Sequence, residues 1–79
     1  MSKLRVTFTF PGDLVQEPVI WQLSQKFEVK TNIRRADVQD DLGWVTLELE
    51  GEEAVLHQGI EWVRSTGTEV ELLTGDVIE

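Results

Sequence analysis

Seventy-nine residues with a hydrophobic share of 41% suffice for one ordered domain with a single small core. The formal net charge of −8, from 15 acidic and 7 basic residues, argues against a nucleic-acid partner, because phosphate backbones are bound by basic surfaces. The lack of cysteine excludes disulfides, thiolate zinc sites and an iron–sulfur cluster held by the chain itself, and we expect no cofactor.

The beginning of the chain leads directly into an alternating pattern of apolar and polar residues. We therefore expect no signal peptide. The longest apolar runs are far shorter than the roughly 18 residues that a membrane span needs. These features predict a cytoplasmic protein that does not insert into membranes.

The first predicted strand covers residues 3–10 and ends at Pro11-Gly12-Asp13. Its apolar residues recur at every second position, which is typical of a half-buried strand: Leu4, Val6, Phe8 and Phe10. A helix follows, with Pro18 in its first turn and an end near Lys26 or Phe27. Its apolar residues recur at helical spacing: Val19, Ile20, Leu23 and Phe27.

Alternation returns from Glu28 to about Arg35. One predicted face holds Val29, Thr31, Ile33 and Arg35, and the other holds Lys30, Asn32 and Arg34. The acidic stretch from Asp37 to Leu42 is predicted to be a turn. The third strand, from Gly43 to Glu50, directs its alternate apolar residues inward: Val45, Leu47 and Leu49.

A second helix is predicted after Gly51, with acidic residues in its first turn and a stop at Gly67. Its core stripe is Leu56, Ile60 and Val63, and Gly59 is expected where this helix closely approaches another element. The last strand is predicted from Thr68 to Leu73, with Val70 and Leu72 inward. Residues 74–79 are expected to be a frayed tail.

The order strand, helix, strand, strand, helix, strand predicts an α+β, ferredoxin-like fold. Its four-stranded antiparallel sheet would carry two helices on one face and leave the other face open. We expect a single domain over residues 1–79, with its core in residues 3–73. The second and fourth strands would be edges, one basic through Lys30 and Arg34 and the other acidic through Glu69 and Glu71. Such edges either attract a second copy or keep a monomer soluble.

Nothing in the chain indicates catalysis, and we expect a protein that is not an enzyme. His57 has no nucleophile motif nearby, and the phosphate-binding Gly-x-x-x-x-Gly-Lys-[Ser/Thr] loop is absent. RNA-recognition modules stack bases on aromatic residues of the central strands, where this chain would expose Trp44 as its single aromatic. The spacing of Asp37, Asp40 and Asp41 matches no calcium loop, and no metal site is expected.

The remaining interpretation of the sequence is that the protein binds a ligand or a partner. Asn32 is a lone amide in a strand expected to be buried, which favours a ligand contact because an amide both donates and accepts hydrogen bonds. Trp21 lies off the apolar stripe of the first helix, and Trp44 points outward. Either tryptophan, with Arg34, is a candidate interface residue, or each simply covers an edge of the core.

From Val6 to Leu73 the sequence resembles the NIL domain, an ACT-like module at the C-terminus of bacterial methionine-importer ATPases. The resemblance rests on matches at Glu17-Pro18, Leu23 with Phe27, Asn32-Ile33, Gly43, Val45 to Leu49, Gly51, Ala54 to Val63, and Gly67 to Leu73. Arg34 and Arg35 depart from the family pattern, which has leucine followed by a small or polar residue.

The resemblance implies a homodimer that binds an amino acid, methionine, with Asn32 in the site. The start of the first helix (Gln16, Glu17, Pro18) and the loop at Asp13 would complete the pocket, where a helix N-terminus suits a carboxylate. Its apolar groove would come from Val15, Val19 and Ile33. Relatives also suggest a transporter or a ferredoxin-type protein as a partner. The alternative is an adaptor that binds a protein through the open sheet face and takes no amino acid.

Overall fold

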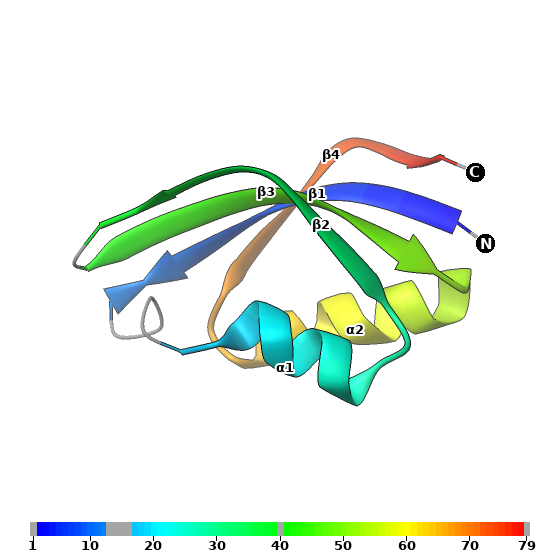
Figure 1. Cartoon of the computed structure of the whole chain (residues 1–79), viewed down its shortest axis with the longest axis horizontal. Helices are drawn as coiled ribbons and strands as arrows, with labels where there is room; N and C mark the ends of the chain where they lie inside the picture. The colour runs from blue at the N-terminus through cyan, green and yellow to red at the C-terminus, as the bar shows by residue number, and fades with distance from the viewer. Residues whose placement is uncertain (1, 13–16, 40, 79) are drawn as a thin grey trace.

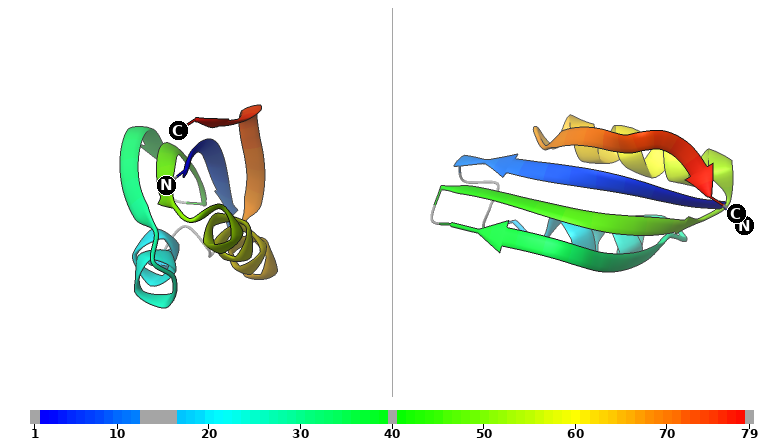
Figure 2. Two further views of the ribbon diagram at one scale, coloured as in Figure 1. Left: turned by 90° about the vertical axis from the view of Figure 1, so that its right-hand side faces the viewer. Right: turned by 90° about the horizontal axis from the view of Figure 1, so that it is seen from above.

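The computed structural model describes residues 2–12, 17–39 and 41–78, and its elements follow the predicted order. They are β1 (Ser2–Pro11), α1 (Val19–Lys26), β2 (Lys30–Val38), β3 (Leu42–Gly51), α2 (Glu53–Ser65) and β4 (Glu69–Ile78). The strands form one antiparallel sheet in the order β2-β3-β1-β4, with the helices on one side of it (Figures 1 and 2). The predicted ferredoxin-like α+β fold is confirmed, with β2 and β4 as its edges.

β1 lies in the centre of the sheet and supplies much of the core. Its alternate side chains are buried as predicted: Leu4, Val6, Phe8 and Phe10. Phe8 pairs with Val45 of β3 and meets Phe10 edge-on, with ring centroids 6.2 Å apart. Because successive side chains of a strand point to opposite faces, the intervening threonines lie on the open face.

The helices meet over the sheet where α2 has its glycine. The buried residues of α2 are the predicted stripe with Gly59 added: Leu56, Gly59, Ile60 and Val63. A Cβ atom placed on Gly59 would lie 2.9 Å from Cδ1 of Leu23, which is itself fully buried on α1. The expectation of a close approach at Gly59 is therefore confirmed, and the neighbour is the other helix.

The hairpin of β2 and β3 is longer than the sequence predicted. Asp37 and Val38 belong to β2, and Leu42 already belongs to β3, so the predicted turn from Asp37 to Leu42 is wrong. Asp37 pairs with Trp44 across the strands. Pairing with a long neighbouring strand overrides the turn preference of aspartate. The connection is closed by a hydrogen bond of 2.8 Å from the Gln39 N–H to the Leu42 carbonyl.

β4 also continues beyond its predicted end at Leu73. Its pairing with β1 shifts register between Leu4 and Val6 and resumes as far as Ile78, so the prediction of a frayed tail after Leu73 is wrong through Ile78. Leu72 pairs with the buried Val6 and therefore lies on the inward face, as predicted. Its exposed fraction is still 37%, since an edge strand has a neighbour on one side only. Of the helices described, neither is long and apolar enough to cross a membrane.

Candidate functional site

Asn32 and Ile33 are neighbours on β2 and lie on opposite faces of the sheet. Asn32 pairs with Glu48 on the open face, whereas Ile33 pairs with the buried Leu47 on the face that carries the helices. The side chain of Asn32 is exposed, so the expectation that its strand buries it is wrong. The reason is that β2 is an edge strand whose open face is not covered by another layer.

Around Asn32 the open face has a small hollow of mixed charge, which we call the Asn32 hollow. It is lined by Lys3, Lys30, Asn32, Glu48 and Glu50. Its volume is about 60 Å³. Ligand sites normally enclose roughly 300–1,000 Å³. One chain alone therefore does not surround an amino acid at this position.

Glu17 and Pro18 lie elsewhere, at the start of α1. Pro18 is the N-cap residue, and its carbonyl accepts a hydrogen bond of 2.9 Å from the Gln22 N–H. Glu17 and Pro18 line a groove with Trp21 and Val38, separate from the Asn32 hollow. Within one chain, the structure does not bring them together with Asn32. The other proposed pocket residues Asp13, Val15 and Gln16 lie outside the described residues.

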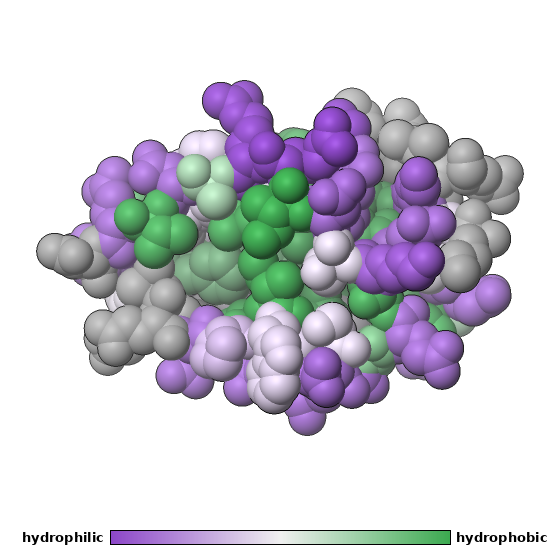
Figure 3. Space-filling view, in the orientation of Figure 1, coloured by the Kyte–Doolittle hydropathy of each residue, from purple (hydrophilic) through white to green (hydrophobic). Residues whose placement is uncertain are grey.

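The groove beside α1 has two exposed apolar residues, Trp21 of α1 and Val38 of β2. Together with Ile33, a further exposed apolar residue of β2, we call them the β2 apolar edge. The exposed fractions of Trp21, Ile33 and Val38 are 62%, 55% and 62%. Figure 3 shows hydrophobic residues gathered on this side of the molecule, above α1. Ile33 and Val38 point toward the helix layer, but the single short helix α1 does not cover the edge strand completely.

The three tryptophans have different environments. Trp62 packs against the core and beside Phe27, with ring centroids 6.3 Å apart, and the Lys26 Nζ lies 5.6 Å from the centre of its ring. Trp44 is half-buried on the open face of β3, where Asp37 is its neighbour on β2. Trp21 is thus the most accessible of the three tryptophans, and Arg34, the remaining interface candidate, lies on the open face.

A β-bulge at Arg34 interrupts the pairing of β2 with β3. Ile33 pairs with Leu47 and Arg35 pairs with Thr46, so Arg34 is the extra residue. A bulge redirects the side chains that follow it. Arg35 therefore lies on the open face, and the prediction that it shares the face of Ile33 is wrong.

The bulge gathers arginines in a second hollow of the open face, which we call the arginine hollow. It is lined by Arg5, Arg34, Arg35, Thr46 and Leu73. Its volume of about 410 Å³ is far larger than that of the Asn32 hollow. The sequence shows the adjacent arginines, but strict alternation would have separated them. This basic site was therefore not predicted.

Glu48 lies next to both hollows. The Arg5 guanidinium donates a hydrogen bond of 2.6 Å to its carboxylate. This hydrogen bond lowers the pKa of Glu48 against the opposing effect of desolvation, and the charges of Arg5, Arg34 and Lys3 lower it further. Glu48 is thus held ionised on the open face.

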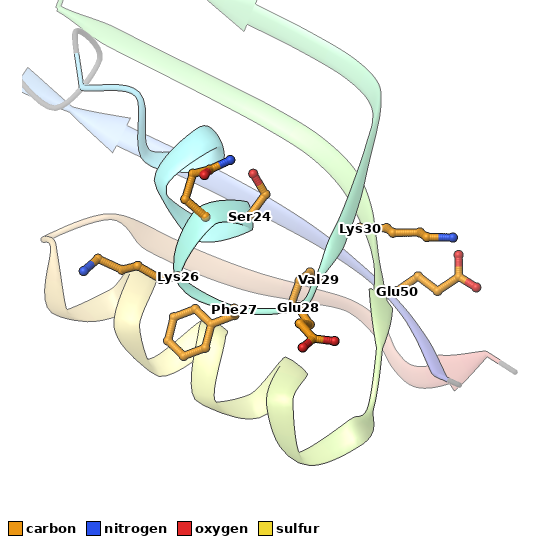
Figure 4. A pocket seen from close by; sticks show the side chains of 8 residues that line it. Ser24, Lys26, Phe27, Glu28, Val29, Lys30 and Glu50 are labelled. Atoms are coloured by element: carbon orange, nitrogen blue, oxygen red, sulfur yellow. The ribbon is translucent and has the colours of Figure 1, made fainter.

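A further hollow lies where α1 ends and the chain enters β2 (Figure 4). It is lined by Ser24, Gln25, Lys26, Phe27, Glu28, Val29, Lys30 and Glu50. The Lys30 and Glu50 side chains point away from α1, whereas Phe27 points toward α2. None of the predicted site residues lines this hollow.

Comparison with known proteins agrees with this architecture, which defines the class of ferredoxin-like α+β domains. The C-terminal domain of an ABC transporter ATP-binding protein from Enterococcus faecalis has a similar structure, with a TM-score of 0.78 and 21% identity over 92% of this chain and 86% of that chain. The de novo designed protein Ferredog-Diesel superposes with a TM-score of 0.54 and 21% identity over 90% of this chain and 83% of that one. Among curated proteins, no sequence matches.

The family is shown by sequence as well. A family model of the NIL domain matches residues 4–72. The chain belongs to the NIL domain family.

Proposed function

We propose that this NIL domain is a non-enzymatic regulatory module that binds an amino acid, methionine, at a homodimer interface in the cytoplasm. The observation that carries the proposal is the edge position and the exposure of β2. The strand that holds the motif residues Asn32 and Ile33 is an edge of the sheet, and most of its side chains are exposed. Unpaired strand edges are ready-made surfaces for association with another chain.

The size of the Asn32 hollow supports a site shared by two chains. At about 60 Å³ it is too small for an amino acid, so further walls have to come from a partner. In the proposed dimer, Glu17 and Pro18 of one copy would complete the site at Asn32 of the other copy, because within one chain they line a separate groove. The β2 apolar edge would supply the apolar contact for a methionine side chain.

The charges of the Asn32 hollow suit a zwitterion. Glu48 is held ionised and can accept hydrogen bonds from an ammonium group, while Lys3 and Lys30 can face a carboxylate. The Asn32 amide both donates and accepts hydrogen bonds. A free amino acid presents this same combination of opposite charges.

Self-association is the first expected result. Sedimentation at micromolar concentration and moderate salt should give about twice the chain mass. Val38→Lys, which places a charge on the β2 apolar edge, should shift the protein toward the monomer. The matched control is Leu72→Lys on the opposite edge strand β4, which should remain dimeric. A wild-type monomer throughout this range would contradict the shared site.

Methionine binding is the second expected result, measured by titration calorimetry. Asn32→Ala should weaken binding by about 1–3 kcal/mol, because polar groups of the complex lose their partner, while the fold is retained. Gln58→Ala removes an exposed amide on α2 and should leave the affinity unchanged. If Asn32→Ala binds as well as the wild type, the site lies elsewhere.

The exposed Trp21 favours a second candidate function, a protein-interaction adaptor. Trp21 and Val38 form an accessible apolar groove with Pro18 at its margin, and aromatic residues are enriched in interface cores. The partner would be a transporter or a ferredoxin-type protein. Absence of binding up to millimolar methionine would support this adaptor function over the amino-acid sensor.

A further inference from the structure

The arginine hollow is separate from the Asn32 hollow and has a different chemistry. We propose that it binds a small oxyanion with two negative charges, either a dicarboxylate or a phosphate. The site is lined by Arg5, Arg34, Arg35, Thr46 and Leu73. Nothing in the proposed amino-acid function requires it.

The backbone shows how three arginines reach one hollow. In a regular strand Arg34 and Arg35 would point to opposite faces, but the bulge at Arg34 leaves both on the open face, where they line the same hollow. Arg5 comes from the central strand β1 and pairs across to Glu48 of β3. Arginines from an edge strand and from the middle of the sheet therefore line the hollow.

The charge balance indicates how much negative charge the hollow accepts. Arg5 is neutralised by Glu48 at 2.6 Å. Arg34 also acts on Glu48 through its charge, but in the described part of the chain neither Arg34 nor Arg35 is held in an ion pair, and a dianion would balance their two positive charges.

The shape and the donors of the hollow favour an oxyanion. Guanidinium groups bind carboxylate and phosphate oxygens through paired N–H donors. The Thr46 and Thr7 hydroxyls share a hydrogen bond of 3.0 Å in which either can donate. When Thr7 donates, the Thr46 O–H is available for a ligand oxygen. A volume of about 410 Å³ accommodates a small molecule.

The experiment is an NMR titration of the full chain with sodium succinate and, separately, with sodium phosphate. The ionic strength is kept constant with sodium chloride, at about pH 8, where the two probes are largely dianionic. We expect saturable shifts at the backbone amides of Arg5, Arg35 and Thr46. The tighter of the two probes identifies the source of the oxyanion.

The variants separate a built site from general charge attraction. Arg34→Gln with Arg35→Gln should weaken binding of the tighter probe at least tenfold. The matched control is Arg64→Gln on α2, which removes an exposed arginine paired with Glu61 and should change the affinity less than twofold. Circular dichroism of each variant checks that the fold is retained.

Equal shifts with chloride alone, or equal affinity in the double variant and the wild type, would overturn the proposal. Absence of saturation with both probes would overturn it as well. None of these outcomes bears on methionine binding, because that measurement uses a different ligand and a different variant.

Discussion

Replacing Phe8 with alanine should lower the free energy of unfolding by about 3–5 kcal/mol. Phe8 is fully buried in the central strand, pairs with Val45, and has Phe10 edge-on at 6.2 Å between ring centroids. Removing the ring leaves a cavity bounded by the sheet and the helices, which cannot close around it without losing other contacts. Since small domains have about 5–15 kcal/mol of stability in total, the variant should be close to unfolding.

Urea denaturation followed by tryptophan fluorescence measures this effect. The matched control is Thr9→Ala, one position along the same strand but on the open face, where the side chain is only half-buried. Surface substitutions of this kind change stability by about 0.5 kcal/mol or less. Equal urea midpoints for Phe8→Ala and Thr9→Ala would mean that the buried face of β1 does not contribute to the stability of the core.

Gly59→Leu should lower the free energy of unfolding by about 1–3 kcal/mol through overpacking. Even a Cβ atom at this position would lie 2.9 Å from Leu23 and 3.8 Å from Phe27 Cδ2, so a leucine has to push the helices apart. The end of the Leu23 side chain could move in open surroundings, but it is fully buried here.

The same denaturation experiment tests this second substitution. Gln58→Leu adds the same side chain to the neighbouring, exposed position of α2, where no such contact arises. It should leave stability within about 0.5 kcal/mol of the wild type. If Gly59→Leu were neutral, the buried stripe of α2 would face another direction.

The elements with a strong apolar period were predictable from the sequence. β1 repeats an apolar residue at every second position, and the stripe of α2 recurs at helical spacing, so burial alone decides which face turns inward. Phe8 and Leu56 were placed in the core for this reason, and they are buried.

The edge strands were less predictable because burial constrains them less. Asp37 prefers turns, and only its pairing with Trp44 shows that β2 continues through it. The bulge at Arg34 has no sequence signature, since a run of exposed polar residues tolerates either face. The predicted face of Arg35 was wrong for the same reason. Arg35 lies two positions after Ile33 and would share its face in a regular strand, but the bulge lies between them.

How the candidate site is assembled could not be predicted from the sequence. The family resemblance implied Asn32 and Glu17 as ligand contacts of one pocket, and the structure places them in separate hollows of one chain. The arginine hollow is lined by residues from all four strands of the sheet, and no local sequence pattern predicts that such distant segments meet.

The pairing of Lys3 with Ile78 has a consequence for protein engineering. The two ends of the chain leave the sheet at the same corner of the molecule, opposite the connection between β2 and β3 (Figures 1 and 2). A reporter fused to either end would therefore emerge at the same place. A short linker should also join the ends into a circular permutant, and the new termini can be opened at the remote β2–β3 connection.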